Sequence, residues 1–319
     1  MTGSAAGTTK IAVVGAGSVG ATAAYACLIR GIGRTIAIYD INGDKTRAEV
    51  LDLQQGLQFV PQATVIGSDD IEVCRGADLV VITAGAKQKP GQTRLELAEA
   101  NVALSRAIVP KLLEVAPDAI LLLVTNPVDV ITYAALKYSG LPPRRVFGSG
   151  TVLDSSRMRL LVAEHCGVAV QNVHAYIAGE HGDSEIPLWS SATIGSVPLL
   201  AWDVPNRPPL DAAAREEIHR RVVGSAGEII RGKGATNYAV GLATARILEA
   251  VLYDQRQVLP VSSLLDGQAG IDDVCLSLPS VVDRLGVEMV LPGPLSEEEA
   301  AGLRRSAETV KSVINSVGL

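Results

Sequence analysis

A glycine-rich segment near the start of the chain has the spacing that binds a dinucleotide. Residues 15–20 read GAGSVG, directly after the apolar run Ile11–Val14 and before a stretch with helical periodicity. Gly15 permits a tight turn, Gly17 lets the backbone approach a pyrophosphate, and Gly20 lets the helix pack closely on the strand. The N-terminus of that helix offers free N–H groups to the anion. The alternative is a structural turn without a ligand, and the strand and helix on either side favour nucleotide binding.

An acidic residue after the next apolar run indicates which dinucleotide. Asp40 follows Thr35–Tyr39 and stands 20 positions beyond Gly20. At that place a carboxylate accepts hydrogen bonds from the ribose hydroxyls and repels a 2′-phosphate. The next three residues, 41–43, include no arginine. The sequence therefore favours NAD over NADP.

His181 is the candidate proton donor. It stands in the segment 179–183, GEHGD, whose two glycines are typical of a turn that comes close to a ligand. An enzyme that moves a hydride to a carbonyl needs a proton donor, and histidine titrates near neutral pH. A single histidine is more often structural, so the interpretation depends on an orienting acid and on arginines elsewhere.

Those partners stand together in residues 153–159, LDSSRMR. On a helix, Asp154 and Arg157 are three positions apart and share one face, whereas Arg159 points almost the opposite way. One face could therefore present a carboxylate to His181 and a guanidinium to a substrate carboxylate. The alternative is that Asp154 caps the helix and pairs with Arg157.

Two polar segments follow strands at the edge of the sheet where ligands bind in open α/β folds. Residues 85–94, GAKQKPGQTR, are basic and rich in glycine, and we expect this loop to bring Arg94 against a substrate carbonyl. Asn126 follows the next strand, in TNP. The alternative for the loop is an ordinary solvated connection.

The elements that must position these residues alternate regularly in the first half of the chain. Short β-branched runs and helix-period stretches predict a doubly wound parallel-sheet Rossmann domain over residues 1–150. The expected strands are 11–14, 35–39, 64–66, 79–83, 120–124 and 146–148, and the expected helices are 19–30, 45–57, 95–113 and 128–138. Residues 151–319 predict an α+β domain, with helices at 153–166, 212–231, 237–251 and 296–317 and strands at 173–177 and 186–194.

Composition excludes several classes of protein. The chain has 28 Lys and Arg against 34 Asp and Glu, a formal net charge of −6, and only 3% aromatic residues. Both features argue against nucleic-acid binding. The longest aliphatic run, Ala119–Val124, is far shorter than the ~20 residues of a membrane span, and residues 1–10 lack the apolar core of a signal peptide. The four cysteines form no CxxC pair, so we expect reduced thiols, no metal site and a cytoplasmic protein.

Across nearly its whole length the sequence resembles the L-lactate/malate dehydrogenase family, and its match to the bacterial L-lactate dehydrogenases is close. Six segments in this order and spacing carry the resemblance: GAGSVG, AGAKQKPGQTR, TNPVDV, LDSSRMR, GEHGDSE and KGATNYA. The resemblance implies an NAD-dependent 2-hydroxy-acid oxidoreductase of glycolysis and fermentation. It implies hydride transfer between nicotinamide C4 and substrate C2, with NAD as the cofactor and pyruvate or L-lactate as the substrate.

The resemblance also implies a role for each residue at a matching position. His181 would exchange the proton, Asp154 would orient it, and Arg157 would hold the substrate carboxylate in a bidentate pair. Arg94 would polarise the C2 carbonyl. The other implied substrate-binding residues are Gln88, Asn126, Asp129 and Thr236. The implied cofactor-binding residues are Gly15, Gly17, Val19, Gly20, Asp40, Lys45, Gly85, Ala86, Ser105, Val124, Asn126 and Ser149.

Gln88 separates lactate from malate chemistry. The malate enzymes of the family have an arginine at this position, which pairs with the second carboxylate of oxaloacetate. A neutral Gln88 would leave that carboxylate desolvated and unpaired, whereas the methyl group of pyruvate needs no partner. Lys87 and Lys89 flank Gln88 but need not face the pocket. We therefore expect lactate chemistry, with malate dehydrogenase as the alternative and a non-catalytic NAD-binding protein as the alternative of another class.

Arg159 and His174 suggest an effector site. In allosteric bacterial members of the family, arginine and histidine at these positions bind fructose 1,6-bisphosphate across a subunit interface. Arg159 already points away from the catalytic face, and a bisphosphate needs about four cationic groups, which two subunits could supply together. The resemblance thus implies a homotetramer activated by fructose 1,6-bisphosphate. The alternative is an ordinary exposed Arg and His.

Overall fold

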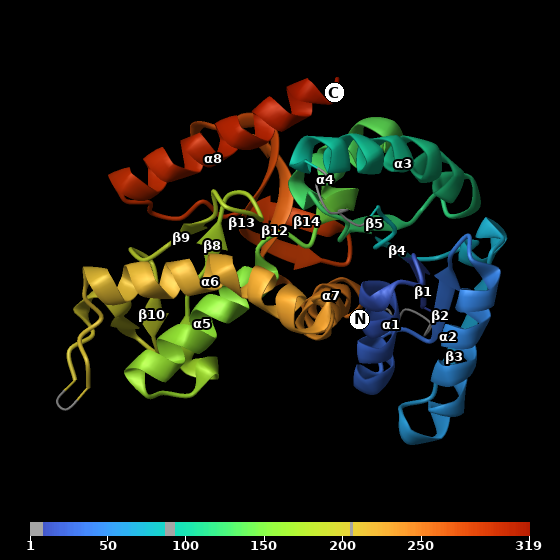
Figure 1. The fold of residues 1–319 in the computed structure, drawn as a ribbon, viewed down its shortest axis with the longest axis horizontal. Helices are drawn as coiled ribbons and strands as arrows, with labels where there is room; N and C mark the ends of the chain where they lie inside the picture. The colour runs from blue at the N-terminus through green and yellow to red at the C-terminus, as the bar shows by residue number, and fades with distance from the viewer. Residues whose placement is uncertain (1–8, 87–92, 205–206) are drawn as a thin grey trace, which may run out of the picture.

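A long mixed β-sheet, covered by helices on both faces, forms the centre of the molecule (Figure 1). The computed structural model describes residues 9–86, 93–204 and 207–319. Within these residues the sheet has nine strands in the order β14-β13-β12-β6-β5-β4-β1-β2-β3. Its first six strands in the chain are β1 (Lys10–Val14), β2 (Thr35–Tyr39), β3 (Thr64–Ser68), β4 (Leu79–Ile82), β5 (Ile120–Leu123) and β6 (Val146–Gly148). These six pair in parallel, which confirms the doubly wound domain.

The two faces of this sheet enter two different cores because successive side chains of a strand point to opposite sides. In β1, Ile11 and Val13 join one core, whereas Ala12 and Val14 join the other. All four side chains are almost completely buried. The runs that are apolar at every position therefore face helices on both sides, as expected for a parallel sheet.

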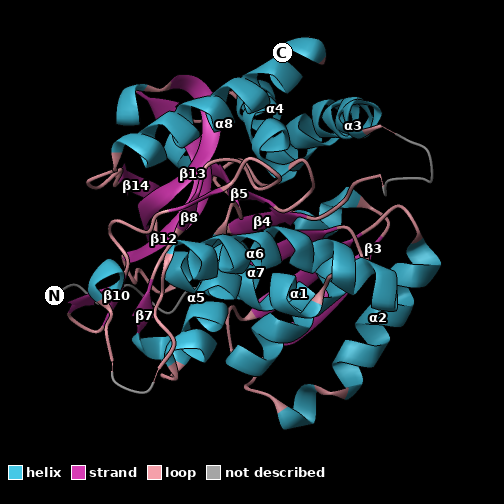
Figure 2. Cartoon of the chain, turned by 60° about the vertical axis from the view of Figure 1, so that its left-hand side comes forward, coloured by secondary structure: helices cyan, strands magenta, loops and turns pink. Residues whose placement is uncertain are grey.

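Helices from both halves of the chain cover the sheet. One face carries α3 (Arg94–Val115), α4 (Val128–Ser139) and α8 (Glu297–Ser316). The opposite face carries α1 (Ser18–Arg30), α2 (Gly43–Gln55) and α7 (Tyr238–Leu252). Figure 2 shows α1 and α7 side by side in front of the strands. No helix among the described residues combines the length and the apolar character needed to cross a membrane.

The second half of the chain extends the same sheet and adds a third core. Antiparallel strands β12 (Gln257–Asp266), β13 (Asp272–Asp283) and β14 (Gly286–Val290) continue it, joined to β6 where Ser262 pairs with Gly148. The third core lies between α5 (Val152–Cys166), α6 (Ala212–Lys233) and short strands. The strands that contribute to it are β7 (Val173–His174), β8 (Ile177–Ala178) and β10 (Thr193–Ile194), whereas β9 (Ile186–Pro187) and β11 (Val197–Pro198) pair with β8 and β10 and lie outside it.

Two strand predictions for this half are wrong in their extent. The expected strand 173–177 is divided between β7, which pairs with β10, and β8, which pairs with β9. The expected strand 186–194 is likewise divided, and Ala192 closes a turn by donating to the carbonyl of Trp189 at 3.3 Å. The chain changes its pairing partner within each segment, and apolar periodicity alone does not reveal such a change.

The glycine turn after β1 has the geometry that its sequence predicts. Gly15 has φ +108°, a conformation that side chains rarely adopt, and a Cβ there would lie 2.7 Å from the backbone N of Ala84. A Cβ on Gly20 would lie 1.9 Å from the carbonyl oxygen of Gly15. At Gly17, by contrast, a Cβ would meet no described atom within 4 Å. Gly15 and Gly20 thus allow close packing of the turn and the helix, whereas the space next to Gly17 remains open.

Substitution of these glycines separates packing from ligand binding. We predict that Gly20→Ala lowers the free energy of unfolding by about 3 kcal/mol, because the methyl group overlaps the Gly15 carbonyl. Gly17→Ala is the matched control: it should leave the melting temperature nearly unchanged and weaken NADH binding, since the methyl stands where a pyrophosphate approaches. Thermal unfolding and NADH fluorescence titration measure the two effects. Equal melting temperatures for the two variants would contradict this account.

Candidate functional site

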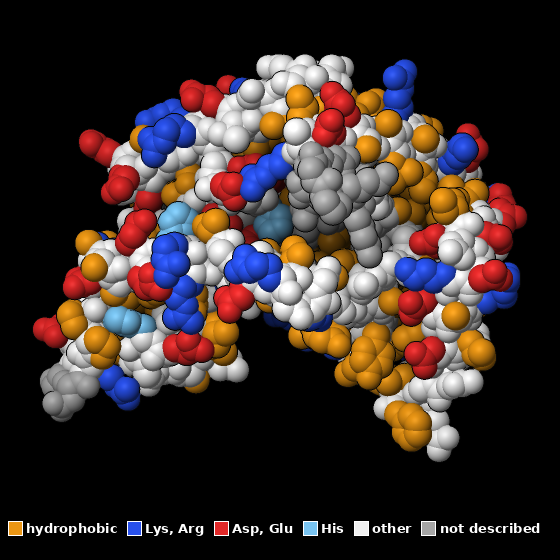
Figure 3. Space-filling view, viewed as in Figure 1, with side chains coloured by type: hydrophobic (Ala, Val, Ile, Leu, Met, Phe, Trp, Pro, Cys, Tyr) orange, Lys and Arg blue, Asp and Glu red, His pale blue; other side chains and the backbone are white. Residues whose placement is uncertain are grey.

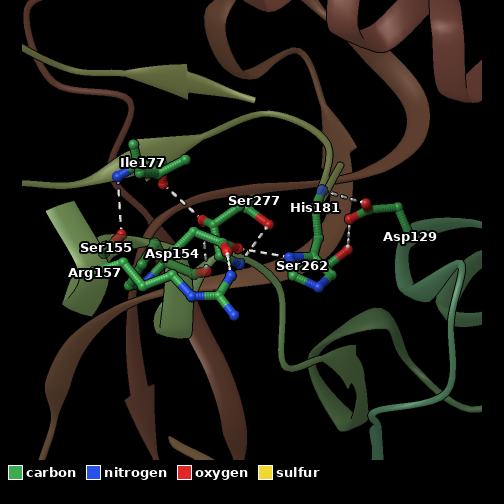
Figure 4. Close-up of polar contacts among 10 residues, drawn as sticks. Asp129, Asp154, Ser155, Arg157, Ile177, His181, Ser262 and Ser277 are labelled. Carbon is green, nitrogen blue, oxygen red and sulfur yellow. Dashed lines mark hydrogen bonds and ion pairs between the residues drawn. The ribbon is translucent and has the colours of Figure 1, made fainter. Parts of the chain in front are cut away.

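His181, Asp154 and Arg157 form one buried polar group (Figure 4). Nδ1 of His181 lies 2.5 Å from Oδ2 of Asp154, and Nη1 of Arg157 donates to Oδ1 of the same carboxylate at 2.7 Å. Asp154 is 2% exposed, whereas 26% of the His181 side chain and 14% of the Arg157 side chain remain accessible. The acid is therefore buried beneath an imidazole and a guanidinium that both reach solvent.

The α5 helix supplies the two partners of His181 from its first turns. Asp154 and Arg157 are three positions apart in α5 and share one face, as the sequence predicts. The alternative for Asp154 was to cap the helix and to pair with Arg157, and the structure does contain that ion pair. The N-cap residue is Thr151, however, so Asp154 serves the ion group rather than the helix end.

The charges in this group set the protonation states. Burial by itself would lower the pKa of His181, but the charge of Asp154 and the hydrogen bond to it outweigh burial and raise that pKa to about 9. Burial would raise the pKa of Asp154, but the charges and hydrogen bonds of His181 and then Arg157 hold that pKa below its usual value. At neutral pH the pair is therefore an imidazolium beside a carboxylate, and the imidazolium has a proton to give.

Asp129 reaches His181 from the other side. Its Oδ2 accepts the backbone N–H of His181 at 2.8 Å, and its Oδ1 accepts the hydroxyl of Ser262 at 2.6 Å. The resemblance places Asp129 among the substrate-binding residues, but its side chain is 2% exposed and each carboxylate oxygen already accepts a hydrogen bond from the chain. Burial raises the pKa of Asp129 to about 6, although the Ser262 and His181 hydrogen bonds oppose this.

Glu185 is a further buried acid that sequence reasoning gave no role. It is 5% exposed, and its Oε1 has no hydrogen-bond partner among the described residues. Burial, and then the negative charge of Asp154, raise the pKa of Glu185 to about 9, so it is neutral at pH 7. Possible ligand atoms of Asp154, His181 and Glu185 lie within 4.8 Å of one another. The protein's own cations, Arg157 and His181, already engage both oxygens of Asp154.

A residue without a predicted role, Asn101, holds the start of the loop after β4. Oδ1 of Asn101, in α3, accepts the N–H of Ala86 at 2.7 Å, and its Nδ2 donates to the carbonyl of Asn126 at 2.7 Å. Asn101 is 2% exposed and so joins the starts of two predicted site segments. Its signal in the sequence is an amide on a helix face whose other buried residues are mostly apolar.

Arg94 and Asn126, two residues of the predicted substrate pocket, lie at the surface. Nη2 of Arg94 lies 2.7 Å from Oδ2 of Asp183, two positions after His181, and both side chains are largely exposed. Asn126 is exposed, and Thr236 is half-buried between α6 and α7. Gln88, with its neighbours Lys87 and Lys89, lies outside the described residues.

Arg159 contacts the segment that directly follows His174. Nε of Arg159 donates to the carbonyl of Ala175 at 2.8 Å, and its guanidinium lies 4.8 Å from the ring centre of Tyr176. His174 is exposed on β7. Arg157 faces Asp154 instead, so the two arginines of α5 serve different sides of the helix, as the sequence predicts.

Comparison with known proteins identifies both halves of the chain. Residues 9–148 match the NAD-binding domain of lactate/malate dehydrogenases, and residues 151–318 match the α/β C-terminal domain of the same enzymes. The chain belongs to the lactate/malate dehydrogenase family. It is 56% identical over 311 residues to an L-lactate dehydrogenase of Bifidobacterium animalis subsp. lactis, a match that covers 97% of each chain. An L-lactate dehydrogenase B of Hordeum vulgare is 49% identical, covering 98% of this chain and 91% of the barley chain.

Solved structures of the family share the fold. The minor L-lactate dehydrogenase of Enterococcus mundtii, solved with ligands bound, superposes with a TM-score of 0.94 at 38% identity. That match covers 98% of this chain and 99% of the other. A lactate dehydrogenase from a Medee basin deep-sea metagenome library gives a TM-score of 0.93 at 37% identity, with the same coverage. The fold class and the family that the sequence predicts are thus confirmed.

The glycine turn fits the NAD that this family binds. No described side chain caps the start of α1, so its first backbone N–H groups are available to an anion. Oδ2 of Asp40 accepts the N–H of Ala16 at 2.7 Å and thereby holds the turn beside the expected ribose position. The other predicted cofactor residues range from the exposed Lys45, Gly85 and Ala86, through the half-buried Val19 and Ser149, to the buried Ser105 and Val124.

Proposed function

We propose that the protein is an L-lactate dehydrogenase, which reduces pyruvate to L-lactate with NADH and catalyses the reverse reaction. The observation that supports this most strongly is the group formed by His181, Asp154 and Arg157. It places a proton donor and a carboxylate-binding cation on one buried acid. Reduction of a 2-oxo acid needs both of these groups at adjacent atoms of the substrate. The names of the relatives agree with this assignment.

Three side chains of the protein act on the substrate. Bound NADH supplies the hydride for C2 of the substrate. His181 uses Nδ1 to contact Asp154, so Nε2 is the nitrogen that gives its proton to the carbonyl oxygen. Arg157 orients the substrate carboxylate, a planar task suited to a guanidinium. Arg94 pairs with Asp183 in this structure. It must release that carboxylate before it polarises the substrate carbonyl, because one guanidinium stabilises a single negative oxygen best.

Pyruvate, rather than oxaloacetate, is the proposed substrate because residue 88 is Gln. A second carboxylate would enter the pocket without a cationic partner at that position and would lose its hydration. Malate dehydrogenase activity is therefore the disfavoured alternative. Residue 88 has no charge to pair with a second carboxylate.

NADH oxidation at 340 nm with pyruvate or oxaloacetate tests this function. We predict a preference for pyruvate, and we predict that Gln88→Arg shifts the ratio of kcat/KM values toward oxaloacetate by about 100-fold, as ~3 kcal/mol of carboxylate pairing would give. His181→Asn should remove most turnover while NADH still binds. An unchanged substrate ratio in Gln88→Arg would contradict the specificity argument. No wild-type turnover with either acid would instead favour a non-catalytic NAD-binding protein.

We further propose a cytoplasmic homotetramer activated by fructose 1,6-bisphosphate through Arg159 and His174. The position of Arg159 on the far side of α5, beside the strand that carries the exposed His174, supports the effector site. Exposed apolar side chains on α1 and α7 support self-association, and Figure 3 shows hydrophobic side chains gathered over this part of the surface. The exposed apolar side chains of α1 and α7 include Tyr25, Ile29, Tyr238 and Leu242, each more than half exposed.

Kinetics with and without fructose 1,6-bisphosphate test the effector site. We predict that the bisphosphate lowers the KM for pyruvate and that Arg159→Gln together with His174→Asn abolishes this effect, because the phosphates lose two of about four cationic partners. Light scattering on the same samples reports whether four subunits assemble. Wild-type kinetics that do not respond to the bisphosphate between pH 6 and 8 would contradict the proposal.

A further inference from the structure

Asp129 is the buried acid whose contacts point to a role that the residue assignments above do not include. It lies in the first turn of α4, whereas its two hydrogen-bond partners belong to other elements, the segment after β8 and strand β12. The carboxylate thus joins three parts of the chain that are more than 50 residues apart in sequence. Figure 4 shows Asp129 against the backbone of His181, across the imidazole from Asp154.

The two acids around His181 contact it in complementary ways. Asp154 holds the ring through Nδ1 at 2.5 Å, and Asp129 holds the main chain of the same residue through N at 2.8 Å. A ring held at one nitrogen can still shift if its backbone moves. Before His181 the chain is anchored, because Gly179 exchanges two backbone hydrogen bonds with Ser277 and the N–H of Glu180 donates to Ser306. After His181, Gly182 has no side chain to restrict such movement. The contact with Asp129 therefore holds the backbone of the proton donor at His181 itself.

The Asp129 carboxylate is itself fixed rather than available to a ligand. Ser262 donates to it at 2.6 Å and is completely buried in β12, at the position that pairs with Gly148. Asp129 is 2% exposed. The start of a helix also favours a negative charge at this place, which lets the acid stay ionised in spite of its burial.

We propose that Asp129 is a positioning residue for proton transfer: its carboxylate, held by Ser262, fixes the backbone of His181 so that the imidazole keeps its place between Asp154 and the substrate. This inference rests on the proposed role of His181 as proton donor. Asp129 acts through His181 and does not touch the substrate. Its negative charge adds to that of Asp154 in favouring the imidazolium.

Asparagine and alanine at position 129 separate the two contributions. In Asp129→Asn the amide oxygen can still accept the His181 N–H, and the amide nitrogen can donate to Ser262, so the contact stays and the charge is lost. Asp129→Ala loses both. Ser262→Ala removes only the contact that holds the carboxylate. Asp283→Asn is the matched control, because Asp283 is also a buried acid, 3% exposed, and accepts a backbone N–H from Leu285 at 2.7 Å at the far end of β13.

The experiment measures kcat, KM for pyruvate and the NADH dissociation constant of each variant from pH 6 to 10. We expect Asp129→Ala to lower kcat by about 100-fold, since a small misplacement of a catalytic group has an effect of this size. NADH binding should stay within about twofold of wild type. Ser262→Ala should lie between Asp129→Ala and wild type, and Asp283→Asn should match wild type.

The pH profile distinguishes positioning from mere stability. The groups that face Asp129 are His181 and Glu180 from the segment after β8 and Cys275 from β13. Among these, His181 is the group on which catalysis depends. Loss of the Asp129 charge should move the alkaline limb of pyruvate reduction in Asp129→Asn to lower pH, with the maximal rate reduced less than about tenfold. Asp154→Asn should move the same limb further, because Asp154 contacts the ring directly.

Three results would overturn the inference. The first is an Asp129→Ala variant with wild-type kcat. The second is an Asp129→Asn variant whose alkaline limb does not move. The third is an Asp129→Ala variant with a raised KM for pyruvate and an unchanged kcat, which would make Asp129 a substrate contact. If Asp129→Ala does not fold, Asp129→Asn and Ser262→Ala decide the question. A wild-type enzyme without pyruvate turnover would contradict the proposed function instead, so the two failures are distinguishable.

Discussion

The site depends on one buried carboxylate, that of Asp154. It is 2% exposed and accepts from two cationic groups at once, with His181 at 2.5 Å and Arg157 at 2.7 Å. A buried acid without partners would be strongly destabilised, so the protein must bring both cations to it when it folds. His181 and Arg157 remain partly accessible to solvent. The buried acid therefore holds a proton donor and a guanidinium where a ligand can reach both. The carboxylate therefore orients both groups that a 2-oxo acid needs.

The large sheet makes this arrangement possible by bringing distant parts of the chain together. Asp154 and Arg157 come from α5, His181 from the segment after β8, and the Asp129 that supports it from the start of α4. The antiparallel strand β12 joins these parts, because its Ser262 pairs with Gly148 of β6 and donates to Asp129. The two halves of the chain thus share one sheet and one site. A change at this junction should disturb catalysis as much as stability.

The sequence predicted most of the first half and the main members of the site. The six parallel strands have strong apolar runs on both faces, so periodicity located them to within about two residues. The spacing of Asp154 and Arg157 correctly placed both on one helix face, with the carboxylate of Asp154 against His181. Asn101, Ser262 and Glu185 were not found, because each acts through long-range burial and a single sequence does not show which polar residues a fold encloses. The small strands near residues 173–194 were extended too far for the same reason, since their pairing partners are not local.

The charge of Asp154 keeps His181 protonated in the enzyme before substrate binds. Titration of His181 by nitrogen-15 NMR of the imidazole, with His181→Asn to assign its signal, tests this most directly. A histidine at its ordinary value loses its proton near pH 6.5, whereas the charge of Asp154 raises the pKa of His181 to about 9. We predict imidazolium shifts up to about pH 9 in wild type and a lower midpoint in Asp154→Asn. A wild-type midpoint near 6.5, unchanged by Asp154→Asn, would contradict the account.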